Sequence, residues 1–358
     1  MAKADKNIND IYSGITVDTI KAYKILKLCV ATESTAMLWG SPGIGKTTMV
    51  YDLAEELDMP CCVFNPSQDD IIDFKLPYVD EDPRYKDEHG KPERISRFAY
   101  SERLPRNKPA IVLVDEINTA NMATQATLYS FVLEGRIGSY KVPPGTIRFA
   151  AGNREHDKCA ANPMSVALKD RLMLHMNVVP SMKGFCQYGA TKGFAPEILA
   201  FIRVAPQNLD KVNSEDPTGG CTPRSLEALS RQIKYGVDRD IELNIINGTI
   251  GRGVGQEFKA FLDLYRASVH IEDIIKNPTK SKIPDKPDIL YSIVSGLGYV
   301  GNESNIESIA KYLSRLDNPS YASIAYDDMV RKNQNMLKCK PIIAFMLKHH
   351  NAIAQDVS

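Results

Sequence analysis

The sequence carries no net charge, since its 358 residues include 44 lysines and arginines and 44 aspartates and glutamates. It is therefore not one of the strongly basic chains that hold nucleic acid or an anionic membrane by bulk attraction. No apolar run approaches the roughly 18 residues of a membrane-spanning helix, and residues 1–10 are polar, so we expect neither a membrane segment nor a signal peptide. Charged residues at 25% and hydrophobic residues at 43% are ordinary for a globular protein and exclude wholesale disorder.

Cysteine is sparse and follows no pattern. The seven cysteines are an odd number, their spacing is irregular, and no C-x-x-C pair occurs. The sequence therefore indicates neither a disulfide framework nor a zinc site. A reducing compartment, the cytoplasm, is the location that we expect.

Through its first half the sequence alternates short apolar runs with amphipathic stretches. The apolar runs predict strands at Ala36–Trp39, Cys61–Phe64, Ala110–Val114, Ile147–Ala151 and Leu172–Val178. The amphipathic stretches predict helices at Thr47–Leu57 and Met122–Leu133. Strands and helices in this order form an α/β fold, with a mostly parallel sheet and helices on both of its faces.

Two segments interrupt this alternation. The first, residues 70–108, is long and charged, and its Asp87-Glu88-His89-Gly90 sequence could close a hairpin. An insert of that size within a compact domain is usually functional or disordered. The second, residues 134–146, has glycines and a Pro-Pro-Gly turn that frame a short hairpin before the next strand. From about residue 182 the pattern becomes helical, with helices predicted at Pro196–Val204 and at Pro223–Tyr235, the latter capped by Thr222.

The strongest motif is the run Gly40-Ser41-Pro42-Gly43-Ile44-Gly45-Lys46-Thr47, followed by Thr48. It fits the phosphate-binding pattern G-x-x-x-x-G-K-[ST] and lies between a predicted strand and a predicted helix, the context that the pattern requires. Glycines let backbone N–H groups wrap around phosphate oxygens, and the helix directs the positive end of its dipole at them. Lys46 would reach the β- and γ-phosphates of ATP, and Thr47 would offer its hydroxyl to Mg²⁺.

Two acidic residues, Asp115 and Glu116, end the apolar run that starts at Ala110. A buried strand that ends in carboxylates places them beside the phosphate loop, at the edge where open α/β sheets bind ligands. We expect Asp115 to hold the hydrated Mg²⁺ and Glu116 to orient and deprotonate the attacking water.

With these motifs on it, the chain resembles the AAA+ ATPases. Three further segments carry the resemblance: Ala151-Gly152-Asn153-Arg154 is similar to sensor 1, Leu168-Lys169-Asp170-Arg171-Leu172 to the segment with the arginine finger, and Thr222-Pro223-Arg224 to sensor 2. The resemblance implies that Asn153 polarises the lytic water and that Arg224 contacts the γ-phosphate. It also implies that Arg171 enters the site of a neighbouring subunit.

Two residues near these motifs have two interpretations each. Asn65 fits the position of a polar switch residue that some AAA+ proteins use to hold the catalytic glutamate, although an asparagine before proline is also an ordinary turn. Trp39, the only tryptophan, precedes the phosphate loop, and core packing is favoured over contact with the base.

The finer resemblance is to the MoxR-like branch of the AAA+ proteins. It is carried by the Asp115-Glu116-Ile117-Asn118 tract, the inserts 70–108 and 134–146, and the segments 193–198 and 251–262, while Thr119 departs from an arginine common among relatives. The implied architecture is a three-layer αβα nucleotide-binding domain with a parallel sheet at 1–180 and an all-α lid with sensor 2 at 181–270. A helical C-terminal extension, 271–358, follows, and the resemblance assigns no role to it.

Membership of this branch would imply a homo-oligomeric ring, usually a hexamer, that acts on a protein client, often with a partner that bears a von Willebrand factor A domain. Tyr140 and Lys141 in the second insert are candidates for pore-facing residues. The first insert has nine acids and four bases in 69–93, then five bases and one acid in 94–108, which suits either a solvated surface or a docking site. The basic segment 329–347 is either a solvated helix face, which is favoured, or a local site for a partner or nucleic acid.

We therefore predict an ATP-hydrolysing MoxR-like ring protein that remodels, matures or activates a protein complex, with ATP and Mg²⁺ as its ligands. Three alternatives stay open. The first is a nucleic-acid motor or restriction-type translocase on the same core, although nucleic acid is not favoured. The second is a chelatase-type ATPase subunit, and the third is a nucleotide-gated binding module that hydrolyses slowly. Both water-handling residues, Glu116 and Asn153, are present, which favours a working hydrolase.

Overall fold

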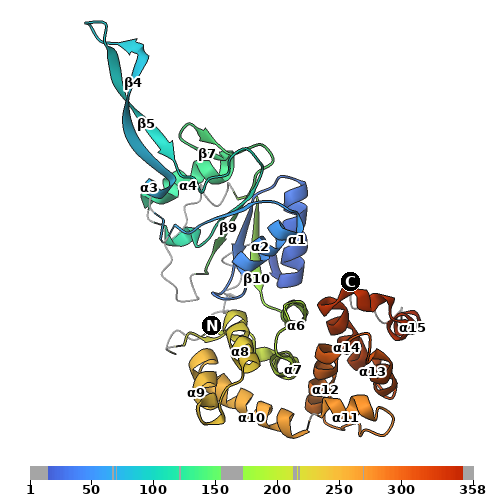
Figure 1. Cartoon of the computed structure of the whole chain (residues 1–358). Coiled ribbons are helices and arrows are strands. Elements are labelled where there is room, and N and C mark those ends of the chain that lie inside the picture. The colour runs from blue at the N-terminus through green and yellow to red at the C-terminus, as the bar shows by residue number, and fades with distance from the viewer. Residues whose placement is uncertain are drawn as a thin grey trace, which may run out of the picture. The chain divides into compact units, whose positions relative to one another are not determined.

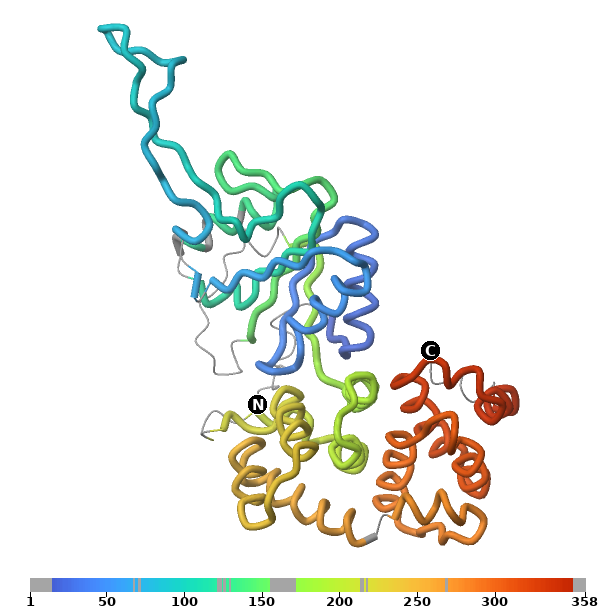
Figure 2. The backbone as a smooth tube through the Cα atoms, in the orientation of Figure 1, coloured from blue at the N-terminus to red at the C-terminus, as the bar shows by residue number. Residues whose placement is uncertain are grey.

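The computed structural model describes residues 15–66, 68–69, 71–120, 122–154, 172–212, 216, 218–268 and 270–349. The chain divides into two compact units, residues 1–179 and residues 180–358, whose course can be followed in Figure 1 and Figure 2. No helix in the described residues has both the length and the apolar character that crossing a membrane requires.

The first unit is built on a six-stranded sheet in which every pair of neighbouring strands is parallel. The strand order is β1-β10-β2-β9-β6-β3. The strands are β1 (Ile15–Asp18), β2 (Ala36–Trp39), β3 (Cys61–Phe64), β6 (Ile111–Val114), β9 (Ile147–Gly152) and β10 (Leu174–Val179). The parallel sheet and the five strands predicted from the apolar runs are confirmed.

Helices cover both faces of this sheet, as Figure 1 shows, because its strands are apolar on both sides. Successive residues of a strand point to opposite faces, so Leu113 packs with α1 (Thr19–Ala31) and α2 (Lys46–Glu56), while Val112 and Val114 pack with α4 (Met122–Glu134). The short elements α3 (Ile71–Phe74) and η2 (Ile117–Thr119) lie on the α4 side. The unit is therefore a three-layer αβα domain, as predicted.

The first insert forms an antiparallel hairpin, β4 (Lys75–Lys86) with β5 (Pro92–Tyr100), which extends away from the sheet in Figure 1 and Figure 2 and is called the arm below. Its turn lies where the sequence predicts it, since the amide of Gly90 donates to the carbonyl of Asp87 at 2.9 Å. Isolated two-stranded hairpins are marginally stable in water, so the arm needs further interactions to hold its shape.

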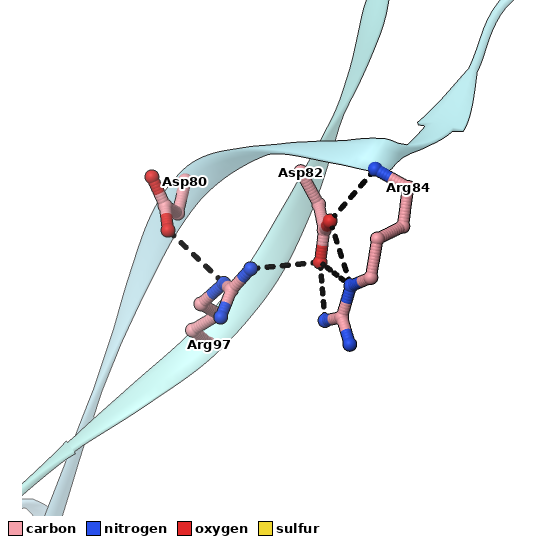
Figure 3. A network of polar contacts seen from close by, with 4 residues as sticks. All are labelled: Asp80, Asp82, Arg84 and Arg97. Atoms are coloured by element: carbon pink, nitrogen blue, oxygen red, sulfur yellow. Dashed lines mark hydrogen bonds and ion pairs between the residues drawn. The ribbon is translucent and has the colours of Figure 1, made fainter.

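A charged network supplies such interactions in the middle of the arm (Figure 3). The Asp82 carboxylate, only 1% exposed, accepts hydrogen bonds from Arg84 (Nε 2.9 Å, Nη2 2.6 Å) and from Arg97 Nη2 (2.7 Å). Arg97 also pairs with Asp80 at 3.0 Å. These arginines hold the pKa of Asp82 well below its ordinary value. The network lies where the strand register shifts, after Asp82, and ties the irregular part of β4 to β5.

The second insert forms the small hairpin β7 (Arg136–Ile137) and β8 (Tyr140–Lys141), as predicted. The expectation that Tyr140 faces a pore is wrong, because its side chain is buried and its hydroxyl donates to the carbonyl of Pro105. Its ring lies 5.6 Å from that of Tyr100 at the base of the arm, and Tyr100 bonds Ser139 through its hydroxyl at 2.7 Å. Lys141 is exposed. The bases of the two hairpins are thus joined.

The second unit is mainly helical. Its helices are α6 (Met182–Thr191), α7 (Pro196–Val204), α8 (Pro223–Tyr235), α9 (Arg239–Ile250), α10 (Arg252–Ser268), α11 (Ile271–Lys276), α12 (Pro287–Val300), α13 (Ile306–Leu313), α14 (Pro319–Lys332) and α15 (Lys340–Lys348). The predicted cap is present, since Thr222 Oγ1 accepts from the amide of Ser225 at 3.2 Å. The expectation of an all-α lid needs one correction, because β11 (Lys211–Val212) and β12 (Gly220–Cys221) pair in a short ribbon.

The second unit has two hydrophobic clusters, one within 185–262 and one within 274–342. A buried ion pair joins the two segments that carry them. Arg203 of α7 donates to both carboxylate oxygens of Asp328 of α14 at 2.8 Å, and it also bonds the hydroxyl of Ser295 on α12. Residues 271–349 therefore pack directly on the helices that precede them.

Candidate active site

The phosphate-binding motif forms a tight loop between β2 and α2. Gly40 has no room for a side chain, since a Cβ there would lie 2.7 Å from the carbonyl oxygen of Val178. Gly45 has φ +98°, a left-handed conformation that other residues rarely adopt. Helix α2 begins directly after it at Lys46, so the positive, amino-terminal end of the helix dipole lies beside the loop. This loop has the form of a phosphate cradle.

Lys46 and Asn153, which are 107 residues apart in sequence, meet at this loop. The buried Lys46 Nζ donates to the carbonyls of Gly40 (2.7 Å) and Ser41 (3.1 Å) and to Asn153 Oδ1 (3.0 Å). Asn153 is buried and follows directly on β9. An ammonium and an amide are therefore held together at the carboxyl ends of the strands.

Thr47 and Asp115 form the second contact at this edge. The Thr47 hydroxyl donates to Asp115 Oδ2, and Asp115 Oδ1 accepts from the amide of Glu116 at 2.9 Å. A hydroxyl and a carboxylate beside a phosphate cradle are hard oxygen donors. Mg²⁺ in nucleotide sites is bound by such donors together with substrate phosphates, so these two residues fit Mg²⁺.

Glu116 occupies an unusual backbone conformation. Its φ of 51° and ψ of 36° are left-handed, which costs energy for a residue other than glycine and is common at functional sites. Thr119 supports this turn, because its hydroxyl donates to the carbonyl of Glu116 at 2.7 Å. Asn118 links the turn to β9 by donating from Nδ2 to the carbonyl of Asn153 at 2.8 Å.

Residues 36–157 match the sequence profile of the ATPase family associated with various cellular activities (AAA). The matched segment contains Lys46, Thr47, Asp115, Glu116 and Asn153. This segment is similar to AAA ATPase domains and is called the AAA domain below. The protein is accordingly an ATPase, and its αβα fold is that of the AAA+ proteins.

The solved structures that match this chain have low sequence identity to it. A point mutant of RuvB from Thermotoga maritima is 16% identical over 77% of this chain and 81% of its own, with a TM-score of 0.36. NtrX from Brucella abortus in complex with ADP is 13% identical over 93% of this chain and 67% of its own, with a TM-score of 0.39. No curated protein sequence matches the chain.

Three other residues that the sequence analysis considered for the nucleotide site are Trp39, Asn65 and Thr48. Trp39 is buried in the core, as expected, with its ring stacked on His175 and Nε1 donating to His175 Nδ1 at 3.2 Å. Asn65 begins a turn in which its carbonyl accepts from the amide of Asp69 at 2.7 Å. Thr48 is exposed on α2.

Two arginines with predicted roles in hydrolysis make no contact, among those that the structure describes, with the cluster of Lys46, Thr47, Asp115 and Asn153. Arg171 lies outside the described residues. Arg224 is exposed in the first turn of α8, in the second unit. The roles of both as arginine finger and sensor 2 stay predictions.

Three residues that bind this cluster together were given no role by the sequence reading. Asn118 and Thr119 lie two and three residues after Glu116, and Arg154 follows Asn153. Arg154 bonds the hydroxyl of Ser41 in the phosphate loop, and its Nη1 donates to Asn177 Oδ1 at 3.3 Å. Their proximity to the motifs was the available signal, but the partners of Asn118 and Arg154 are distant in sequence.

Proposed function

We propose that the protein is a MoxR-like AAA+ ATPase that forms a homo-oligomeric ring, binds Mg-ATP between its subunits and uses hydrolysis to remodel or activate a protein complex. The observation that carries the proposal is the meeting of Lys46, Thr47, Asp115, Glu116 and Asn153 at the carboxyl edge of one parallel sheet. Lys46 and Thr47 begin α2, Asp115 and Glu116 follow β6, and Asn153 follows β9. Together these groups would serve phosphate binding, metal binding and water activation.

Each residue has a separate part in hydrolysis. The loop residues 40–48 surround the phosphates, and Lys46 exchanges its carbonyl partners for phosphate oxygens. Thr47 and Asp115 would hold Mg²⁺, which when bound neutralises phosphate charge. Glu116 orients a water for in-line attack on the γ-phosphorus and accepts its proton, while Asn153 orients the same water. Arg171 of the neighbouring subunit and Arg224 would offset the negative charge that develops.

The two joined hairpins support a remodelling role. The arm projects from the AAA domain (Figure 1) and carries exposed apolar side chains, Leu76, Tyr78, Val79, Tyr85 and Phe98, beside charged ones. Its base contacts the β7–β8 hairpin through Tyr100, and the next strand after that hairpin is β9, which Asn153 follows directly. A protein client, with a von Willebrand A-domain partner in the cytoplasm, is the target that we propose for these hairpins.

A mixing experiment tests the shared site. Chains with Arg171→Ala and chains with Glu116→Ala should each be inactive, whereas a mixture should recover part of the ATPase rate, because some interfaces pair an intact glutamate with an intact finger. The control mixture combines Arg171→Ala with the Arg171→Ala/Glu116→Ala chain, which supplies no finger and should stay inactive. Absence of recovery despite confirmed co-assembly would contradict a finger acting between subunits.

The same preparation separates the alternatives. Stimulation of the ATPase by DNA or RNA that falls steeply with salt would identify a nucleic-acid motor instead. Metal insertion into a cofactor in the presence of partner subunits would identify a chelatase. Stimulation by a von Willebrand A-domain protein, and by neither of these, is the result that we expect.

A further inference from the structure

Arg154 and Lys46 both contact Ser41 of the phosphate loop. Its guanidinium bonds the hydroxyl of Ser41, and the carbonyl of the same Ser41 accepts from Lys46 Nζ at 3.1 Å. Ser41 is only 3% exposed. Two cations of the same chain therefore meet one residue of the cradle, one through its main chain and one through its side chain.

Arg154 is placed by elements that also build the site. It comes directly after Asn153, whose Oδ1 accepts from Lys46, and its Nη1 donates to Asn177 of β10 at 3.3 Å. Asn177 in turn donates to Thr16 of β1 at 3.2 Å. The guanidinium is thus attached to the sheet through β9 and β10 and lies at the start of the loop, on the side of Asn153.

We propose that Arg154 is a second phosphate-binding cation, which leaves the Ser41 hydroxyl and donates to oxygens of the terminal phosphate when ATP binds. A planar guanidinium matches a phosphate with two parallel hydrogen bonds, and such charge-assisted bonds are stronger than those to a neutral hydroxyl or amide. The terminal phosphate is the target because Arg154 adjoins Asn153, the residue that we propose orients the water for attack on the γ-phosphorus. This inference rests on the proposed nucleotide site.

The chemical consequence is discrimination between ATP and ADP within one chain. Lys46 reaches the β-phosphate, which both nucleotides have, as well as the γ-phosphate, so its loss affects both nucleotides. Arg154 binds only oxygens of the terminal phosphate, which ADP lacks. Loss of Arg154 should therefore weaken triphosphate binding selectively. A residue that only shapes the loop would affect both nucleotides alike.

The test measures binding of ADP and of a non-hydrolysable ATP analogue to the full-length chain by isothermal titration calorimetry. Arg154→Ala should weaken binding of the analogue at least about tenfold, as expected for loss of a charge-assisted hydrogen bond, and change ADP binding less than about threefold. Arg154→Lys, which keeps a charge but not the fork, should lie between wild type and Arg154→Ala. It replaces Arg154→Ala if that variant does not fold.

Two comparison variants make the outcome decisive. Ser41→Ala removes the hydroxyl and keeps the arginine, so it should retain the preference for the triphosphate. An equal loss of both nucleotides in Arg154→Ala, or a lost preference in Ser41→Ala, would overturn the inference and assign Arg154 a loop-shaping role. Lys46→Ala should abolish binding of both nucleotides. If it did not, the proposed nucleotide site itself would be wrong, which is a separate failure.

Discussion

The side-chain amide of Asn118 donates to the main-chain carbonyl of Asn153 at 2.8 Å, and this bond ties the turn that begins at Glu116 to the end of β9. Asn118 is 2% exposed and lies against Gly152, where an added Cβ would come within 2.7 Å of Asn118 Oδ1. Asn118 therefore positions the turn at Glu116 relative to Asn153, the two residues that are expected to handle water.

Asn118→Ala should lower kcat about tenfold and leave KM for ATP within about threefold, because a lost hydrogen bond of about 1 kcal/mol misplaces the water-handling groups but not the phosphate loop. Steady-state ATPase assays at several ATP concentrations measure both constants. Gly152→Ala, which pushes on the same contact, should give the same split. If both variants kept the wild-type kcat and lowered kcat/KM only by raising KM, Asn118 would not position the catalytic groups.

Arg203→Met should destabilise the second unit by about 3 kcal/mol at pH 7.5, because it leaves the buried Asp328 carboxylate without the guanidinium that donates to both of its oxygens. The matched control is Arg331→Met. Arg331 pairs with Asp327 at 2.8 Å, but both side chains are about a third or more exposed, so this change should cost less than about 0.5 kcal/mol. Urea denaturation of both variants measures the difference, and equal effects would contradict the account of the ion pair.

The stability of the second unit should also depend on pH through Asp328. Burial raises the pKa of Asp328 to about 6, because loss of hydration outweighs the attraction of Arg203. The folded chain then binds this proton more tightly than the unfolded chain, so the stability that the group contributes is fully present below about pH 4 and is lost as pH rises through about 6.

Asp328→Asn cannot titrate and isolates this effect. The free energy of unfolding of the wild type minus that of Asp328→Asn should fall by about 2 kcal/mol between pH 4.5 and pH 7. Urea denaturation at a series of pH values gives this difference. A difference that stays constant, or that grows with pH, would mean that the carboxyl is ionised throughout this range.

Asp82→Asn should loosen the arm without unfolding the AAA domain. The change removes the charge that gathers Arg84 and Arg97 where the strand register shifts (Figure 3). Amides of β4 and β5 should exchange with deuterium several-fold faster, while the thermal midpoint of the whole protein stays unchanged. Asp80→Asn is the control, since Asp80 pairs only through Arg97 in this network and is more exposed, and its effect should be smaller.

Local patterns predicted much of the fold. The motif of the phosphate loop predicts a strand, a loop and a helix within a dozen residues, and these elements lie where they were expected. Thr222 and Pro223 set the start of α8, which was also predicted. Strand β1 was missed because it lies at the edge of the sheet, where Ile15 is half exposed, and pairs with β10, which begins at Leu174. Such pairing leaves no local signal.

The site residues that were missed share this reason. Arg154 and Asn118 have partners 113 and 35 residues away, and no pattern near them in the sequence predicts those partners. Tyr140 was misjudged in the same way, since its burial depends on Pro105 and Tyr100 rather than on its own hairpin. Arg203 stands in an apolar helix, and its partner lies 125 residues later. Motif chemistry is local, whereas the contacts that position it are not.

The rate of single-turnover ATP hydrolysis by Glu116→Gln, measured beside its affinity for ATP, tests the central claim most directly. The variant keeps the size and hydrogen-bonding capacity of the side chain but cannot accept a proton. The account predicts ATP affinity within about threefold of the wild type and hydrolysis slower by at least about a hundredfold. Near-normal hydrolysis would contradict the assignment of Glu116 as the base, and with it the proposed site.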